Sequence, residues 1–278
     1  MTQTELLKAV PDDWHDGDKV TVRISKINDN DNDNENRLKM KALQHITFTG
    51  VDEKTDIKTL VEIQKAYPLV EFGVLVAKNW KENGNRYPDP DTLSRLANKG
   101  LNLSCHVCGS YARAITQDIE WSHLFDLLGE NKDIFNRCQI NIAANEPTDK
   151  TFYLKTPRYF KEIIIQQKSV DEHKTWDAIN WHGFMSILLD ASGGLGIDTG
   201  IKLWPDWFYK VGYAGGMNAD NVGDKLAYLL ENAHHPFWID MESGVRTDDW
   251  FDLDKVVKVL DECNKVLASY TPEQLHRR

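Results

Sequence analysis

The sequence predicts a (β/α)8 barrel that carries an N-terminal β-hairpin extension. From residue 45 onward, eight short apolar and β-branched segments alternate with amphipathic segments, which implies parallel strands joined by right-handed crossovers. Residues 45–278 also have a length close to the ~250 residues typical of this barrel. An open doubly wound sheet is the alternative, but its glycine-rich turn normally follows the first strand. Here the glycine-rich turns come late, after the sixth and seventh strand segments, which favours the barrel.

Two spacings of hydrophobic residues locate the predicted strands and helices. Short β-branched runs predict strands, and apolar residues spaced three to four apart predict helices. Asn218–Leu230 predicts a helix that Asn218 caps, and Asp252–Leu267 predicts the last helix. The predicted strands are residues 45–49, 70–76, 101–107, 135–142, 162–166, 186–190, 211–214 and 237–241. The apolar stripe of the last helix comprises Leu253, Val256, Val257, Leu260, Cys263, Val266 and Leu267.

Residues 1–44 form the predicted extension. Lys19–Ile27 and Arg37–Leu43 alternate apolar and polar side chains, which is typical of hairpin strands. The tract Asn28–Asn36 (NDNDNDNEN) joins them, and its residue types favour a solvated turn. A calcium loop is the alternative interpretation, because oxygen ligands at alternate positions suit Ca²⁺. The central Gly and terminal Glu of such a loop are not in place, so the turn is preferred, and the role of the hairpin stays open.

Composition limits the partners. The chain has 278 residues, with 33 Lys and Arg against 43 Asp and Glu, and a formal charge of −10. Because nucleic-acid affinity comes mainly from clustered basic residues, we expect no nucleic-acid partner. Backbone N–H groups can still hold one small phosphate. The first residues do not predict a secretory leader, and no apolar run approaches the ~20 residues that a membrane helix needs. We expect a cytoplasmic protein without a membrane partner, and an oligomer remains open.

Three late segments carry candidate chemistry. Asp190 ends the sixth strand and is followed by Gly193, Gly194 and Gly196, which let the backbone approach a ligand. Gly215 and Gly216 precede a helix, where N–H groups at the positive end of the helix dipole attract an anion. Ser243 and Gly244 follow the eighth strand and could complete the same phosphate site. Each segment alone is a weak signal, and their order and spacing together are stronger.

The motifs LLDxSGGxG, AGGMNxxNV and IDMESGV, in that order, resemble those of the phosphoribosylanthranilate isomerases. The resemblance is good over residues 186–267 and only in outline before them. There, Thr47–Gly50, Asn85-Arg86-Tyr87 and Gln139–Asn141 match the family's first-, second- and fourth-strand motifs. The resemblance implies a phosphate-binding barrel of tryptophan biosynthesis. It also implies an Amadori rearrangement of an aminoaldose phosphate to an aminoketose, which requires no metal or organic cofactor.

The resemblance also implies residue roles. Asp190 would be the general acid that protonates the ring oxygen, and Arg86 would contact the substrate carboxylate. Asp240 would hydrogen-bond the sugar or the amine, and Asn141 and Gly194 would contact the substrate. The backbone N–H groups that would hold the phosphate belong to Gly215, Gly216, Ser243 and Gly244.

Three positions depart from the family pattern. Thr49 stands where the family has its catalytic Cys, Asn141 where it has His, and Arg246 where it has an acidic residue. A Thr hydroxyl is not a usable base near neutral pH, and the rearrangement needs one to take the C2 proton. Asp52, three residues after Thr49, and His106 on the third strand are candidate replacements, as are Cys105 and Cys108.

Other polar and aromatic clusters favour structural interpretations. Cys105-x-x-Cys108 could be redox-active or half a zinc site. With Cys138 as the only nearby further ligand, a buried pair of small hydrophobic residues is preferred. Cys263 falls on the last helix stripe, and His234-His235 lies at the structural end of the barrel. The aromatic residues between 176 and 213 suit helix packing, with a lid or stacking wall as the alternative.

The sequence therefore predicts an aldose–ketose isomerase-like enzyme with an altered general base, acting on a small phosphorylated substrate. Two alternatives stay open. One is a different phosphate-binding barrel enzyme, such as a lyase or synthase. The other is a catalytically silent barrel that binds a phosphorylated ligand or a protein partner.

Overall fold

The computed structural model describes residues 43–78, 80, 84–118, 120–141, 160–170, 184–204 and 210–270. They belong to one compact unit, Lys41–Arg277. The predicted hairpin and its Asn/Asp tract lie outside the described residues, except for Leu43, which opens the first barrel strand. Within the aromatic segment, residues 176–183 and 205–209 are also outside them. Among the described helices, none has both the length and the apolar character needed to cross a membrane.

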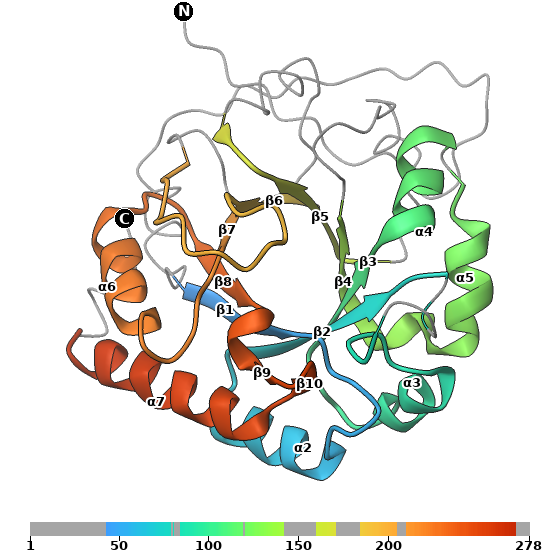
Figure 1. The fold of residues 1–278 in the computed structure, drawn as a ribbon, viewed down its shortest axis with the longest axis horizontal. Helices are drawn as coiled ribbons and strands as arrows, with labels where there is room; N and C mark the ends of the chain where they lie inside the picture. Colours follow the sequence, from blue (N-terminus) through green and yellow to red (C-terminus); the bar gives the residue numbers. More distant parts are fainter. Residues whose placement is uncertain are drawn as a thin grey trace, which may run out of the picture. The chain divides into compact units, whose positions relative to one another are not determined.

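Eight parallel strands close into a barrel in chain order, from β1 next to β2 round to β8 next to β1, which confirms the predicted fold class (Figure 1). Every neighbouring pair is parallel, as right-handed helical crossovers require. The strands are β1 (Leu43–Thr49), β2 (Val70–Val76), β3 (Leu103–Val107), β4 (Phe135–Ile140), β5 (Glu162–Gln167), β6 (Met185–Asp190), β7 (Val211–Ala214) and β8 (Phe237–Met241).

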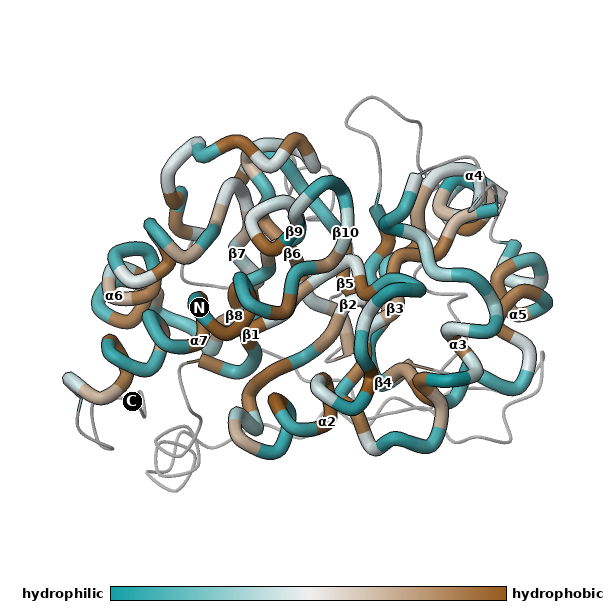
Figure 2. The backbone as a smooth tube through the Cα atoms, turned by 60° about the horizontal axis from the view of Figure 1, so that its bottom comes forward, coloured by the Kyte–Doolittle hydropathy of each residue, from teal (hydrophilic) through white to brown (hydrophobic). Residues whose placement is uncertain are grey.

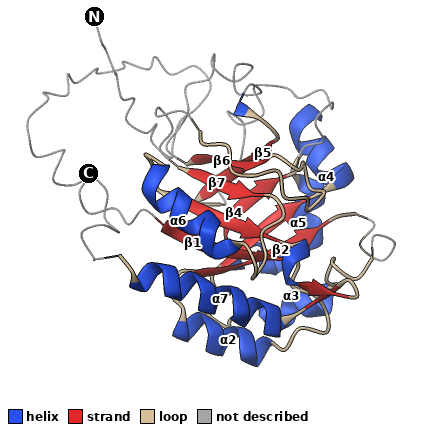
Figure 3. Ribbon diagram, turned by 60° about the vertical axis from the view of Figure 1, so that its left-hand side comes forward, coloured by secondary structure: helices blue, strands red, loops and turns tan. Residues whose placement is uncertain are grey.

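The helices lie outside the ring of strands, as Figure 3 shows. A short antiparallel hairpin of β9 (Arg246–Thr247) and β10 (Trp250–Phe251) follows β8. The described α-helices are α2 (Ile57–Ala66), α3 (Pro90–Leu96), α4 (Gly109–Arg113), α5 (Ser122–Leu128), α6 (Val222–Asn232) and α7 (Leu253–Ala268). Shorter turns are the π-helical Ala114–Asp118 and the 3-10 turns Gly129–Ile134 and Ser243–Val245.

Helix α6 begins later than predicted. Asn221, rather than Asn218, is the residue before its first turn. Asn218 lies in the preceding turn, where its carbonyl accepts the N–H of Val222 at 3.0 Å. Asn221 Oδ1 accepts the N–H of Asn218 at 2.9 Å, so the two Asn side chains build the turn together. Two Asn residues three positions apart both suit the capping role, which is why the sequence alone misplaced the start.

Helix α7 begins as predicted and differs in its buried face. The Asp252 side chain accepts the N–H of Lys255 at 3.1 Å, as an N-cap does. Val256, Val259 and Leu260 are buried, whereas Val257 is 38% exposed. The buried stripe therefore includes Val259 and leaves out Val257, and the helix packs on α6.

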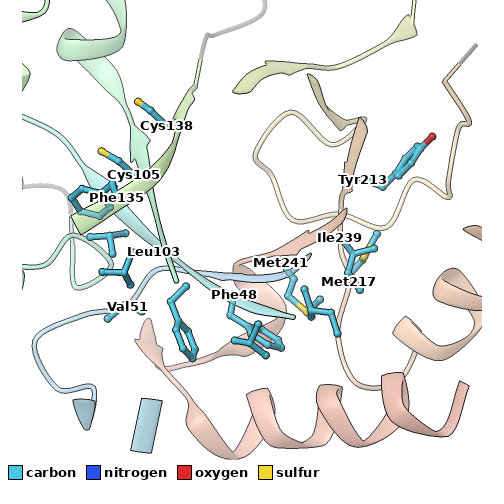
Figure 4. Packing of buried hydrophobic residues seen from close by; sticks show 14 of the residues in the cluster. Phe48, Val51, Leu103, Cys105, Phe135, Cys138, Tyr213, Met217, Ile239 and Met241 are labelled. Atoms are coloured by element: carbon cyan, nitrogen blue, oxygen red, sulfur yellow. The ribbon is translucent and has the colours of Figure 1, made fainter. Parts of the chain in front are cut away.

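The hydrophobic core lies between the strands and the helices. Outward-facing strand residues such as Phe48, Val74 and Ile239 are fully buried in it. Figure 2 shows hydrophobic stretches along the barrel strands and alternating turns on the helices. Figure 4 shows Cys105 and Cys138 side by side on β3 and β4, where they are register partners. Both thiols are free and buried in this core. Side chains at alternate strand positions point to opposite faces, so the remaining positions line the barrel interior.

Charged residues fill the barrel interior near the amino ends of the strands. Arg137 on β4 donates to Glu71 on β2 at 2.9 Å and to Glu162 on β5 at 3.2 Å, and its side chain is 4% exposed. The guanidinium also lies 4.2 Å from the ring centroid of Trp238 on β8. Lys210 reaches Glu162 from outside at 3.0 Å. This cluster fills the barrel interior beneath the carboxyl ends of the strands.

Candidate functional site

A cleft of about 400 Å³ opens at the carboxyl ends of the strands. In this barrel fold that end carries the active site. The predicted site residues that line it are Arg86, His106, Asn141, Asp190, Gly194, Gly215, Gly216, Asp240 and Ser243. Asp52 and Gly244 are not among its lining residues. Residues far apart in the sequence thus meet in one cavity.

Asp190 ends β6 and is buried at the cleft wall. Its Oδ1 accepts the N–H and the hydroxyl of Ser192, at 3.1 and 2.7 Å. Its Oδ2 accepts Gln166 Nε2 at 2.9 Å and the N–H of Gly194 at 2.5 Å. The glycines permit this fold-back, since Gly193 and Gly194 have φ of 64° and 85°. The carboxyl is therefore held in one orientation toward the cleft, and Gly194 acts as its support.

Asp240 on β8 is the second buried carboxyl of the cleft. Its Oδ1 accepts the hydroxyl of Thr49 on β1 at 2.8 Å. Burial raises the pKa of Asp240 to about 8, although the Thr49 hydrogen bond acts in the opposite direction. A carboxyl with a pKa near neutrality can both take and give a proton at physiological pH. Thr49, at the position of the family Cys, thus orients an acid–base group.

The side chains of Thr49 and His106 lie on either side of Gly73 in the barrel interior. Gly73 on β2 separates them, and a Cβ placed on it would meet Thr49 Oγ1 and lie 3.0 Å from His106 Nε2. Since Gly73 has no side chain, both polar groups reach the cleft.

We expect Gly73→Ala to destabilise the protein by about 1–3 kcal/mol, because the added methyl group would push Thr49 or His106 aside. Gly223→Ala in helix α6 is the matched control. Its Cβ would meet only Val266 Cγ2, at 3.7 Å, and alanine favours a helix, so this change should stabilise the protein. Urea unfolding of both variants measures the difference. Equal stabilities would contradict the steric argument.

His106 does not have the properties of a general base for this site. Its Nε2 lies 3.0 Å from Ser104 Oγ, and the residue is 1% exposed. Burial, with Arg137 nearby, lowers its pKa to about 3. The ring is therefore neutral near pH 7 and a weak base, so we assign it a polar contact role.

Asp52 has a structural role, because contacts within the protein occupy its carboxylate. Its side chain is fully buried, and it forms an ion pair with Arg246 at 3.3 Å. It also accepts the N–H of Phe251 at 2.6 Å and the hydroxyl of Thr55 at 2.9 Å. These contacts join the loop after β1 to the β9–β10 hairpin. Arg246, which departs from the family pattern, is thus the structural partner of Asp52, and we leave Asp52 out of the catalytic set.

The glycine turns after β7 and β8 form one end of the cleft. Gly215 and Gly216 have φ of 113° and 59°, which other residues rarely adopt. The loop after β6 packs onto Gly216 through the backbone of Asp198. Gly244 lies behind this surface, where a Cβ would overlap the carbonyl of Met217. Gly244 therefore permits close packing of the two turns, while Gly215, Gly216 and Ser243 face the cleft.

An ion pair holds the loop after β6 over these turns. Lys225 Nζ on α6 donates to Asp198 Oδ1 at 2.7 Å and to the carbonyl of Gly215 at 3.1 Å. Asn221 Nδ2 donates to Asp198 Oδ2 at 3.1 Å. The Lys225 side chain is only 10% exposed. A cation and the start of helix α6 thus lie beside the glycine turns, an arrangement that can attract an anion.

We expect Lys225→Met to weaken the binding of inorganic phosphate about tenfold, because the Asp198 carboxylate would remain beside the anion site without its cation. Titration calorimetry at constant ionic strength measures the affinity. Lys265→Met, at an exposed pair with Glu262, is the control and should bind like the wild type. Unchanged affinity in Lys225→Met would contradict this arrangement.

The opposite end of the cleft contains Arg86 and Asn141. Arg86 donates to Glu242 at 2.8 Å and to Asp249 at 2.7 Å. Asn141 accepts Gln139 Nε2 at 2.9 Å and donates to Cys108 Sγ at 3.2 Å. Cys108 lines the cleft, unlike Cys105, so the predicted pair is divided between the cleft and the core. Burial raises the pKa of the Cys108 thiol to about 12, so it is not a thiolate near pH 7.

Several contacts that shape the cleft were not predicted from the sequence. They are Glu242 and Asp249 on Arg86, the Asp198–Lys225 pair, and the link from Thr49 to Asp240. One signal was present in the strands. Polar residues alternate through segments that should be continuously apolar in a parallel sheet, as in Thr47 and Thr49. That pattern indicates a polar barrel interior.

With this geometry established, the structure was compared with solved structures. Phosphoribosylanthranilate isomerase from Thermotoga maritima matches with a TM-score of 0.52 and 18% identity, over 80% of this chain and 100% of that one. The N-(5′-phosphoribosyl)anthranilate isomerase of Pyrococcus furiosus matches with a TM-score of 0.50 and 16% identity, at the same coverage. A third isomerase structure, in complex with reduced 1-(o-carboxyphenylamino)-1-deoxyribulose 5-phosphate, has a TM-score of 0.50 and 17% identity, also at this coverage.

The chain shares the barrel fold of these enzymes. The similarity at this identity concerns the fold. No family model matches the sequence. No curated protein matches it either.

Proposed function

We propose that the protein isomerises an aminoaldose phosphate to an aminoketose phosphate, with Asp190 and Asp240 as the proton-transfer groups. One observation carries the proposal. Two buried carboxyls, on β6 and β8, line a single cleft. Glycine turns form one end of that cleft, and Lys225 and the start of helix α6 lie beside these turns. An aldose–ketose isomerisation needs one proton donor, one proton acceptor and an anchor for the phosphate. The fold shared with the isomerases supports the same reaction class.

The proposed phosphate anchor comprises Gly215, Gly216 and Ser243. Glycine turns at this position of the barrel, before a helix, present backbone N–H groups to an anion. With the phosphate there, the sugar extends along the cleft past Asp190 and Asp240 toward Arg86. A cytoplasmic location belongs to this proposal, whereas a place in tryptophan biosynthesis, which the sequence resemblance implies, would depend on which substituent the substrate amine carries.

Asp190 acts first in the proposed reaction. It gives its proton to the ring oxygen as the C1–O bond breaks, and the nitrogen lone pair forms a C1=N bond. In the protonated acid, the Ser192 hydroxyl can turn from donor to acceptor, since a hydroxyl does both. The Gln166 and Gly194 donors keep the carboxyl in place during the transfer.

Asp240 acts second, as the general base. Its carboxylate takes the C2 proton, the C2–H electrons form a C1=C2 bond, and the C1=N electrons return to nitrogen. Protonation at C1 and loss of the enol proton then give the aminoketose and restore both carboxyls. Among the base candidates, Asp240 is buried in the cleft, oriented by Thr49 and near neutrality in pKa. His106 and Cys108 lack a suitable pKa, and Asp52 lies elsewhere.

The test uses the N-phenylribosylamine 5-phosphate that aniline and ribose 5-phosphate form in solution. We expect the wild type to convert it to 1-phenylamino-1-deoxyribulose 5-phosphate in D2O, with deuterium at C1 detected by NMR. Asp190→Asn should lower the rate at least 100-fold. Phosphate binding without conversion would favour a different barrel enzyme or a silent binding protein, and would overturn the proposal.

A further inference from the structure

Arg86 is the positive group at the sugar's far end of the cleft, and two carboxylates of the protein already contact it. Its Nη1 lies 2.8 Å from Glu242 Oε1, and its Nη2 lies 2.7 Å from Asp249 Oδ1. Each terminal nitrogen of the guanidinium therefore has its own anionic partner. A substrate carboxylate would have to displace one of them and then lie beside it.

The charge balance around Arg86 is unfavourable for a further anion. Arg246 is the second guanidinium nearby, and it is shared between Asp52, at 3.3 Å, and Asp249, at 3.5 Å. Two guanidinium groups thus face three carboxylates. An additional carboxylate would raise this excess of negative charge in a partly buried setting, where like charges repel more strongly than in water.

The Asp249 contact is built into the backbone. The β9–β10 hairpin turns through two residues, Asp248 and Asp249, with φ of 49° and 60°. Such a turn normally uses Asn-Gly or Asp-Gly, because residues with a Cβ are strained in this conformation. The sequence keeps an aspartate at the second position, and this aspartate reaches Arg86.

A second cavity of about 420 Å³ adjoins the cleft at this point. Its lining is Ala77, Arg86, Tyr87, Cys108, Gly109 and Asp249. Arg86, Tyr87 and Cys108 also line the cleft, so the two cavities share part of their walls. A substituent on the substrate amine would enter this cavity, because the phosphate occupies the opposite end.

From these contacts we infer that the substrate of the proposed isomerase carries a neutral or cationic amine substituent without a carboxylate. The Glu242–Arg86–Asp249 cluster is the group that excludes a carboxyl-bearing aryl amine. The inference rests on the proposed function and specifies its substrate class.

The test compares two non-reactive ligands that differ only in the carboxylate. They are reduced 1-phenylamino-1-deoxyribulose 5-phosphate and its o-carboxyphenyl counterpart. We expect the wild type to bind the phenyl compound at least tenfold more tightly, as measured by titration calorimetry. Asp249→Asn should reduce this ratio at least threefold by improving the affinity for the carboxyl compound. Asp248→Asn is the matched control, since this neighbour in the same turn forms no ion pair with Arg86 in the described structure.

The outcomes separate the two claims. Equal or tighter binding of the carboxyl compound to the wild type overturns the inference and leaves the proposed function standing. If neither compound binds and inorganic phosphate does not bind either, the proposed function fails, and the inference fails with it. The wild-type comparison needs no variant, so a folding defect in Asp249→Asn does not affect it.

Discussion

Asp240→Asn is expected to lower the proposed isomerisation rate by a factor of about 10³, because the variant lacks the group to which we assign removal of the C2 proton. The asparagine can still accept the Thr49 hydroxyl, so the local geometry is kept. The same variant should be more stable than the wild type near pH 8. Loss of activity together with a gain in stability distinguishes a catalytic carboxyl from a structural one.

The sign of the stability effect follows from the raised pKa. Asp240 titrates near 4 in the unfolded chain and near 8 in the folded one, so the folded state binds its proton more tightly. Its contribution to stability is present below the unfolded pKa and decreases as the pH rises toward about 8. Asparagine does not titrate, so Asp240→Asn should lack this decrease. Thermal unfolding between pH 5 and pH 8 measures it, and a variant less stable than the wild type at pH 8 would contradict the assignment.

The activity of the wild type should rise with pH through about 8, as the Asp240 carboxylate forms. Burial and the neighbouring Glu71 and Glu242 raise this pKa, while Thr49 and Arg137 lower it. Thr49→Val removes a hydrogen bond that favours the carboxylate, so the rise should move to higher pH. Thr49→Ser keeps the hydroxyl and is the control. A pH profile that is the same in Thr49→Val and the wild type would refute the role of Thr49.

Arg137→Met is expected to destabilise the protein by about 3–5 kcal/mol, because removing one partner leaves buried carboxylates without a counter-charge. Glu71 and Glu162 both contact the Arg137 guanidinium, and their side chains are 1% and 10% exposed. Methionine has a similar length and fills most of the space, so the loss is mainly electrostatic. Urea unfolding at pH 7 measures the change.

The control for Arg137→Met replaces the three buried charges of the ion cluster together and leaves the partly exposed Lys210 in place. The triple variant Arg137→Met, Glu71→Gln and Glu162→Gln removes the charges together, and it should regain a large part of the lost stability. Burial alone would raise the pKa of Glu162, but the charges of Arg137 and Lys210 lower it on balance. Its stabilising contribution is therefore present above its unfolded pKa and is lost as the pH falls through the folded value. A single variant as stable as the wild type would show that the cluster carries little energy.

The strands and the barrel closure were predictable because their signals are local. Each strand is a short apolar run between turn residues. The late glycines indicate at which strand ends a ligand is expected to bind. Strand β1 begins at Leu43, two residues early, and β3 at Leu103, two residues late, because pairing between neighbours decides where strands end. The described structure places most predicted site residues in one cleft.

The remaining features depend on contacts between distant residues. Arg86 lies 163 positions before Asp249, and Thr49 lies 191 positions before Asp240, so their pairing follows only from the closed barrel. Asp52 looked available as a base because the partner that occupies it, Arg246, is nearly 200 positions away. The residue types are visible in the sequence, whereas the partner that each side chain takes is a property of the fold.

The apolar layer between strands and helices is separate from the polar barrel interior, and this separation has a consequence for the evolution of such a protein. The fold depends mainly on side chains between strands and helices, such as Phe48 and Leu260, which do not line the cleft. Most of the cleft residues at the strand ends lie outside this core cluster, and only Met217 and Met241 belong to both. Substitutions at the strand ends can therefore alter the reaction or the accepted substrate while the scaffold persists. That separation makes the chain a suitable starting point for directed evolution toward other ligands.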